Sequence, residues 1–231
     1  MVAFLLQSVG AVVTLRYVTP FSSSFMVKAR FAAWFDSDPR PWRLQYDWRP
    51  IREISPQAAI AVVASEDQQF PYHNGFDVRA IRKALADAED GGPLRGASTI
   101  SQQVAKNLFL WSGRSFVRKG LEAWFTVLIE WLWPKQRILE VYLNIAEFGR
   151  GIYGVQAAAT VYFHKDARRL GTSEAALLAA VLPNPLRLKA DRPSRYVQRR
   201  QREIQEQMRA LGGPAWLRGV LVNSGSQAPR P

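Results

Sequence analysis

Apolar residues recur along most of this chain at helical spacing, and few runs alternate as strands do. Several helices have clear start and stop signals. Ser55-Pro56 supplies an N-cap and a first-turn proline, and Thr99 with Gln102 has capping-box spacing. Ser194 is placed to cap the last helix, which Gly212 stops and whose apolar stripe is formed by Val197, Ile204, Met208 and Leu211. The pattern predicts a mainly α-helical domain.

Other segments fit the same picture. Helices are expected over 78–88, over 121–133 until Pro134 interrupts, and from Thr172 or Ser173 to a point before Pro183. Residues 149–154 match G-x-G-x-x-G, the dinucleotide-binding fingerprint, but strands and helices do not alternate around them. We interpret these glycines as a turn between helices that lets backbones approach closely. Asp36 and Asp38, in a proline-rich connector, are assigned to solvent.

The beginning of the chain is apolar. The stretch VAFLLQSVGAVVTL is closed by Arg16 and then Pro20, and it is shorter than the roughly 20 residues that span a bilayer. A signal peptide would need a basic leader, which is missing here. We interpret residues 1–20 as a truncated or marginal membrane anchor, residues 21–223 as one domain, and the Gly/Ser/Pro-containing residues 224–231 as a flexible tail.

Composition narrows the possible partners. The chain has 231 residues, 48% of them apolar, which is enough for one substantial core. A formal charge of +12 favours an anionic partner, and nucleic acid, an acidic membrane surface and a phosphorylated substrate all satisfy that condition. The absence of cysteine excludes disulfides and thiolate chemistry.

The segment 58–75 combines an apolar run with acidic, aromatic and imidazole side chains. If residues 58–64 form a buried helix, Glu66 and Asp67 emerge at its end beside a wall that excludes water. Such a wall raises the pKa of a carboxyl toward the range that is useful for proton transfer. The alternative is a helix whose acidic end simply meets solvent.

The motifs resemble the five signatures of the peptidoglycan glycosyltransferases, glycosyltransferase family 51, in their monofunctional form. They occur in the family's order between about residues 54 and 193: E66-D67-x-x-F70-x-x-H73-x-G75, then G96-A97-S98-T99-I100-S101-Q102-Q103-V104-A105-K106-N107, R118-K119-x-x-E122, K135-x-x-I138-L139-E140-x-Y142-L143-N144, and a fifth from E174 to P185. Five ordered motifs are far more specific than any one of them.

The resemblance implies a bilobal domain with a lysozyme-like larger lobe and a small membrane-proximal jaw lobe, preceded by the N-terminal transmembrane helix. It implies an enzyme that polymerises lipid II into β-1,4-linked glycan, with inversion and release of undecaprenyl pyrophosphate. The acceptor hydroxyl must lose a proton, and Glu66 is the expected catalytic base. Glu122 is the second catalytic acid, which steadies developing positive charge or helps to hold a divalent ion, Mg²⁺ or Mn²⁺. No nucleotide or organic cofactor is expected.

The leaving pyrophosphate requires cations. Lys106 and Arg114 are the candidates to neutralise it, and Arg118 and Lys119 add positive potential. The helix start at Ser98 and Thr99 offers free backbone N–H groups to an anion, and Gln102 and Gln103 are placed to hydrogen-bond sugar or phosphate. Asp67 is expected to orient the supporting loop that holds Phe70 and His73. For Glu122 the alternative is a simple i, i+4 pair with Arg118.

The segment 107–117, NLFLWSGRSFV, is apolar and aromatic around a Ser-Gly-Arg turn. We interpret it as a mobile jaw that meets lipid, with ordinary core packing as the alternative. Trp124, Trp131 and Trp133 are assigned to the core, and the basic stretch 187–202 to anionic lipid heads or a solvated helix face. Glu140, Tyr142 and Asn144 are assigned to a helix in which Ile138, Val141 and Ile145 are core residues and Asn144 satisfies a neighbouring loop.

These interpretations predict an enzyme of the bacterial inner membrane, single-pass, with its catalytic domain on the periplasmic face. Its expected partners are lipid II, the growing glycan on undecaprenyl pyrophosphate, membrane lipid and other cell-wall synthesis proteins, and no nucleic acid. Two alternatives are a lysozyme-like or lytic enzyme that cleaves glycan, and a non-catalytic membrane scaffold. The scaffold would not need Glu66 or Glu122.

Overall fold

The computed structural model describes residues 2–35, 42–89, 98–113 and 115–226, and it confirms the mainly helical prediction. Its α-helices are α1 (Val2–Tyr17), α2 (Ser24–Ala33), α3 (Pro56–Glu66), α4 (Val78–Glu89), α5 (Ile100–Phe109), α6 (Phe116–Leu132), α7 (Lys135–Ile145), α8 (Val155–Phe163), α9 (Thr172–Val181), α10 (Arg195–Ala210) and α11 (Gly213–Ser226). Two 3₁₀ turns, η1 (Ile51–Glu53) and η2 (Ala167–Arg169), and three short strands complete the described elements.

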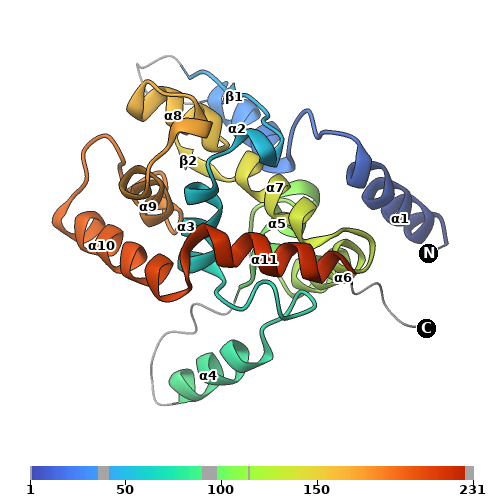
Figure 1. The fold of residues 1–231 in the computed structure, drawn as a ribbon. Helices are drawn as coiled ribbons and strands as arrows, with labels where there is room; N and C mark the ends of the chain where they lie inside the picture. The colour runs from blue at the N-terminus through green and yellow to red at the C-terminus, as the bar shows by residue number, and fades with distance from the viewer. Residues whose placement is uncertain (1, 36–41, 90–97, 114, 227–231) are drawn as a thin grey trace.

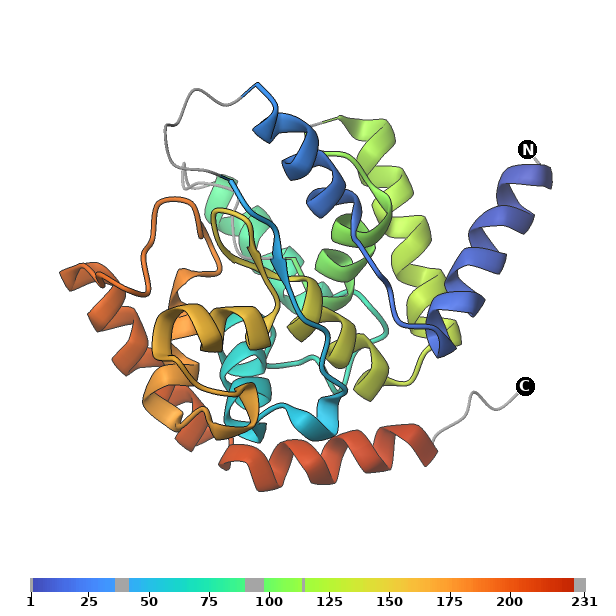
Figure 2. The same ribbon diagram turned by 90° about the horizontal axis from the view of Figure 1, so that it is seen from above.

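The helices form two groups around a buried centre. In Figure 2, α2, α5 and α6 lie together on one side, α8, α9 and α10 lie on the other, and α3 and α7 run between them. Residues 58–64 of α3 are all buried, and α3 packs against α7, α9, α10 and α11. This arrangement fits the expected lysozyme-like domain, and it explains why the run 58–64 is apolar on every face.

The expected capping signals are present. Ser55 caps α3, Thr99 and Gln102 form a complete capping box on α5, and Ser194 caps α10. Each of these side chains accepts or exchanges hydrogen bonds with backbone N–H groups that the first helical turn leaves unpaired. Helix α11 was not predicted, and its last residues, 224–226, fall in the segment assigned to the tail.

A small sheet corrects the interpretation of the glycine-rich segment. Strands β2 (Glu147–Gly149) and β3 (Ile152–Tyr153) form a bulged antiparallel pair, and β1 (Gln45–Tyr46) joins β3 in parallel. The glycines therefore lie in and after a β-hairpin, not in a turn between helices. The predicted close approach is confirmed, because a Cβ on Gly151 would lie 2.6 Å from the Arg43 carbonyl oxygen, and one on Gly154 would lie 2.6 Å from that of Asn144.

Helix α1 packs on α6. Trp124 Nε1 donates to Ser8 Oγ (3.1 Å), and Trp133 Nε1 donates to the carbonyl of the fully buried Val12 (2.8 Å). Trp133 is buried as predicted, and Trp124 is partly buried and packs against the core, but Trp131 is 67% exposed and its assignment to the core is wrong. No helix among the residues that the structure describes is both long enough and apolar enough to cross a membrane.

Asn144 has the predicted role of satisfying a loop. Its Oδ1 accepts from the backbone N–H of Arg49 and its Nδ2 donates to the carbonyl of the same residue, both at 2.8 Å. This pair of bonds fixes the connection between β1 and η1 against α7. Asp36 and Asp38, which were assigned to solvent, lie outside the described residues.

Candidate active site

Glu66 is the last residue of α3 and reaches the surface where that buried helix ends. Gln103 of α5 donates from Nε2 to Glu66 Oε2 (2.8 Å), and the buried Tyr142 donates its hydroxyl to Gln103 Oε1 (3.2 Å). These two hydrogen bonds fix the orientation of the Gln103 amide, so that its N–H group faces the Glu66 carboxylate. Burial raises the pKa of the Glu66 carboxyl, against the opposing effects of the Gln103 bond and of the charges on Arg200 and Lys106.

Asp67, the next residue, organises the supporting loop. Both its carboxylate oxygens lie 3.0 Å from His73 Nε2, and Gly75 N–H donates to His73 Nδ1 (3.0 Å). Because Nδ1 accepts that bond, Nε2 carries the proton that is donated to Asp67. Asp67 also accepts from the N–H of Ile100 (3.0 Å), at the start of α5. The carboxylate therefore joins the end of α3, the loop and α5.

The start of α5 is closed, which corrects the predicted anion site. The N–H of Thr99 donates to Gln102 Oε1 (2.9 Å), the N–H of Gln102 donates to Thr99 Oγ1 (3.2 Å), and the N–H of Ile100 is taken by Asp67. The Thr99 hydroxyl donates to the Gly75 carbonyl (2.7 Å). Asp67 occupies the place where an external anion would bind at this helix terminus. Thr99 and Gln102 are buried and serve the fold, and only Ser98 of this group is exposed.

A second acidic residue lies among cations. Glu122 of α6 is 4% exposed, and it accepts from Arg118 Nη1 (2.9 Å) and Lys119 Nζ (2.5 Å). The predicted i, i+4 pair with Arg118 is thus present, together with an i, i+3 pair. Arg118 keeps one buried nitrogen, Nε, without a partner. Together, Arg118 and Lys119 carry two positive charges against the single negative charge of Glu122.

Lys106 lies in the electric field of both acids. Burial lowers the pKa of its ammonium group, the carboxylates of Glu122 and Glu66 raise it, and Arg118 and Lys119 lower it further. Its Nζ is 5.6 Å from the centre of the Phe25 ring, on the apolar side of the site. A partly desolvated ammonium that is influenced by two carboxylates has charge available for a phosphorylated ligand. Arg114, the other predicted pyrophosphate residue, lies outside the described residues.

A pocket of about 300 Å³ opens beside Glu66. It extends from the end of α3 toward the first turn of α4, the start of α5 and the last turn of α10. Carboxylate, amide and hydroxyl side chains line much of it, including Glu66, Gln69, Asp77, Ser98 and Gln207.

Comparison with known proteins identifies the family to which these features belong. The family model described as Transglycosylase matches residues 40–209. The chain belongs to the transglycosylase family. It is 58% identical over 218 residues to a biosynthetic peptidoglycan transglycosylase of Xanthomonas euvesicatoria pv. vesicatoria (strain 85-10), covering 94% of this chain and 87% of the relative. It is also 54% identical over 214 residues to a biosynthetic peptidoglycan transglycosylase of Pseudomonas entomophila (strain L48), and this match covers 93% of this chain and 90% of the relative.

This transglycosylase has three further residues around the site whose positions the motifs did not reveal. Lys135 Nζ donates to the His73 carbonyl (2.6 Å), pairs with Glu130 (2.8 Å) and lies 4.6 Å from the centre of the Phe70 ring. Phe70 is completely buried, so Lys135 holds the supporting loop through contacts on its buried side. The fourth signature contains Lys135 and was the available signal. No sequence signal pointed to Glu130, because nothing in its sequence context distinguishes it from other helical glutamates.

Arg200 is the third such residue. It belongs to the basic stretch 187–202 and had no distinguishing pattern there. In the structure its Nη2 donates to the carbonyl of Ser65 (3.3 Å), directly before Glu66, and its charge lowers the pKa of the Glu66 carboxyl. Packing of α10 on α3 brings the two together.

Proposed function

We propose that this transglycosylase polymerises lipid II into β-1,4-linked glycan in bacterial cell-wall synthesis, with release of undecaprenyl pyrophosphate. The observation that carries the proposal is Glu66, a carboxyl with a raised pKa that Gln103 fixes beside a pocket and that shares its surroundings with the cation Lys106. The reaction needs a base next to a sugar hydroxyl and positive charge next to a leaving pyrophosphate. The names of the relatives agree with this assignment.

The mechanism follows from these positions. The growing chain on undecaprenyl pyrophosphate is the donor, and the 4-hydroxyl of the N-acetylglucosamine of lipid II is the acceptor. Glu66 removes the hydroxyl proton as the oxygen attacks the anomeric carbon from the face opposite the pyrophosphate, which inverts an α-linked donor to a β-1,4 bond. Lys106, with Arg118 and Lys119, offsets the charge that collects on the departing pyrophosphate.

We propose that the residues around Glu122 do not form a resident metal site. Among the described residues no cluster of three or more His, Cys, Asp or Glu side chains could hold a metal ion, and both Glu122 oxygens already accept from Arg118 and Lys119. Mg²⁺ in phosphoryl enzymes is bound by one or two carboxylates together with substrate phosphates. The divalent ion expected from the resemblance is therefore proposed to bind mainly to the pyrophosphate oxygens, and no step of the mechanism passes through it.

Incubation of the purified full chain with labelled lipid II and Mg²⁺ in detergent tests the function. We expect glycan polymer, resolved by length on a gel. Shortening of preformed glycan without polymer formation would instead indicate a lytic enzyme, and binding of lipid II without any turnover would indicate a scaffold.

We further propose that the domain works at the periplasmic face of the bacterial inner membrane, held there by residues 1–20 and by contact of the jaw with lipid. Several large apolar side chains of α2, α6 and the segments beside them are exposed: Phe21, Phe31, Trp34, Phe35, Trp111, Phe116, Val117 and Trp131. Figure 2 shows α1, α2 and α6 at the same side of the molecule. Such a concentration of exposed aromatic side chains is typical of a surface that meets a membrane.

Serine at Trp111 and Phe116 is expected to reduce binding of the protein to phosphatidylglycerol-containing vesicles by roughly tenfold or more, because each lost side chain is worth about 1.5–3 kcal/mol when buried in lipid. Their exposed fractions are 54% and 98%. Phe109 is a poor choice for this test, because it stacks on Phe125 with ring centres 4.3 Å apart. Vesicle sedimentation measures the effect. The control is Tyr196→Ser on α10, and equal losses in both proteins would contradict the jaw assignment.

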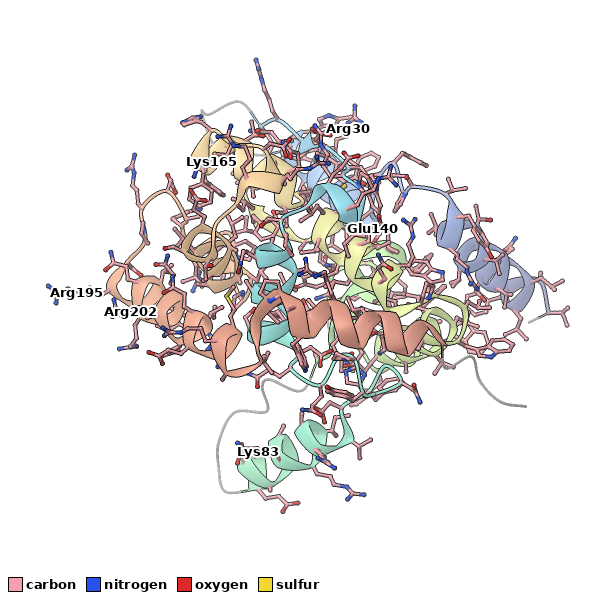
Figure 3. The ribbon with its side chains drawn as sticks, viewed as in Figure 1. Arg30, Lys83, Glu140, Lys165, Arg195 and Arg202 are labelled. Atoms are coloured by element: carbon pink, nitrogen blue, oxygen red, sulfur yellow. The ribbon has the colours of Figure 1, made fainter. Side chains whose placement is uncertain are left out.

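The basic stretch 187–202 fits a solvated face better than a lipid contact. Arg195 and Arg202 point outward from α10 at the edge of the molecule opposite α1 (Figure 3). Arg199 and Arg200 pair with Glu203, with closest distances of 3.9 and 3.3 Å. We propose that membrane contact comes from the α1 and α2 side.

Arg200→Gln is expected to move the acidic limb of the pH–rate profile to higher pH. Glu66 acts as a base only when deprotonated, and the positive charge of Arg200 lowers the pKa of the Glu66 carboxyl. Removal of that charge raises this pKa, so activity is lost at a higher pH as the solution is acidified. Initial polymerisation rates against pH measure the limb. Arg199→Gln is the matched control on the exposed face, and a limb that moves equally in both variants, or in neither, would contradict the proposed coupling.

A further inference from the structure

The pocket beside Glu66 differs in charge from the rest of the site. No Lys or Arg side chain is among the described residues that line it, whereas three acidic residues, Glu66, Asp67 and Asp77, do. Lys106, Arg118 and Lys119 do not line it. A pyrophosphate would be repelled in this pocket, and an uncharged ligand rich in hydrogen-bond donors would be favoured. The hydroxyl groups and acetamido N–H of a sugar have this character.

The side chain of Gln207 has an unsatisfied hydrogen-bond acceptor, which indicates that a ligand binds in this pocket. It lies on α10 between the buried Ile204 and Met208, so its backbone is held firmly. Its side chain lines the pocket, and its Oε1 is buried without a hydrogen-bond partner. Most buried polar atoms in folded proteins are hydrogen-bonded, and a buried acceptor without a donor is unfavourable. A turn of the terminal amide toward the pocket would let a donor from a bound ligand satisfy it.

We propose that Gln207 is a saccharide-binding residue whose carbonyl oxygen accepts a hydrogen bond from a hydroxyl or acetamido N–H of the glycan while the glycan lies against Glu66. The inference rests on the proposed function, and it divides the site into a part that binds sugar and a part that binds pyrophosphate. The pocket holds an uncharged sugar ring, and the pyrophosphate lies on the side of Lys106. Packing of α10 on α3 then has a purpose in catalysis, because it places one sugar contact at a fixed position relative to the base.

Gln207→Met removes the acceptor and keeps the length and helix propensity of the side chain. Gln198→Met is the matched control, because Gln198 lies on the same helix, is exposed, and its side chain donates to the Pro193 carbonyl (3.1 Å), away from the pocket residues. For lipid II polymerisation we expect kcat/KM of Gln207→Met to fall by roughly five- to thirtyfold, with a larger change in KM than in kcat, and an unchanged or higher Tm. Kinetics equal to those of Gln198→Met would overturn the proposal.

Binding without turnover separates this proposal from the proposed function. A soluble tetramer of N-acetylglucosamine and inorganic pyrophosphate serve as probes, followed by calorimetry or by chemical shifts. We expect Gln207→Met to weaken binding of the tetramer and to leave binding of pyrophosphate unchanged. The reverse result would place phosphate in the pocket and overturn the assignment. If the native chain makes no polymer, the proposed function fails, and tetramer binding that depends on Gln207 would still stand.

Discussion

Glu66→Gln is expected to reduce the rate of lipid II polymerisation by about 10²–10⁴-fold, the usual contribution of a general base. Glutamine has nearly the same shape and can still accept the hydrogen bond from Gln103 Nε2, so the geometry around the pocket is retained. It cannot take the proton from the acceptor hydroxyl. Single-turnover polymerisation with excess enzyme measures the chemical step without a contribution from product release.

The same substitution is expected to leave the melting temperature at neutral pH unchanged or higher. Burial raises the pKa of the Glu66 carboxyl on folding, so the charged form is less favourable in the folded protein than in the unfolded chain. At pH values above the unfolded pKa this group therefore destabilises the fold, and a neutral amide removes the effect. Loss of activity together with retained or increased stability would identify a catalytic acid–base group rather than a structural one.

Two comparisons make the outcome decisive. Glu206→Gln, on the exposed side of α10, is expected to leave both rate and stability unchanged. Asp67→Asn is expected to lower the melting temperature, because Asp67 holds both His73 and the N–H of Ile100. If Glu66→Gln retained a rate within a few-fold of the native chain while Asp67→Asn, still folded, lost it, the base would be Asp67.

Features that depend on neighbouring residues in the sequence were predictable. The capping box of Thr99 and Gln102 and the buried run 58–64 follow from spacing and composition, and the structure contains both. The small sheet was missed because β1 and β3 are each only two residues long and come from distant parts of the chain. Two residues give no periodic pattern, so tertiary pairing alone creates this element.

The site shows the same contrast between residues that local sequence reveals and residues that only tertiary packing brings in. The candidates Glu66, Glu122 and Lys106 could be named because ordered motifs contain them, and the structure brings them into one electrostatic group. The expectation for the start of α5 failed for a physical reason. A helix N-terminus attracts any anion, and Asp67, which is 33 positions earlier than Ile100, already satisfies it. Gln207 and Arg200 reach the site only because α10 packs on α3, and no local pattern marks such contacts.

Lys106→Met is the second substitution for which a large effect is expected, a loss of about 10²–10³-fold in kcat, comparable to the removal of one preorganised donor from a site where charge develops. The variant should fold, since Glu122 keeps Arg118 and Lys119, and Glu66 keeps Gln103. Lys106 acts on the leaving pyrophosphate, so its loss should lower kcat more than it raises KM for lipid II. Steady-state kinetics at saturating lipid II, with Lys83→Met on the exposed face of α4 as the control, measures the effect.

Lys106→Arg then separates charge from general structure through the alkaline side of the pH–rate profile. Burial lowers the pKa of the Lys106 ammonium group, so it loses its proton at a lower pH than an ordinary lysine, and activity should decline as the pH rises through that pKa. Arginine stays protonated throughout this range. We therefore expect Lys106→Arg to recover part of the rate lost in Lys106→Met and to move the alkaline limb to higher pH. An alkaline limb at the same pH in the native chain and in Lys106→Arg would assign that ionisation to another group and leave Lys106 with a role in binding alone.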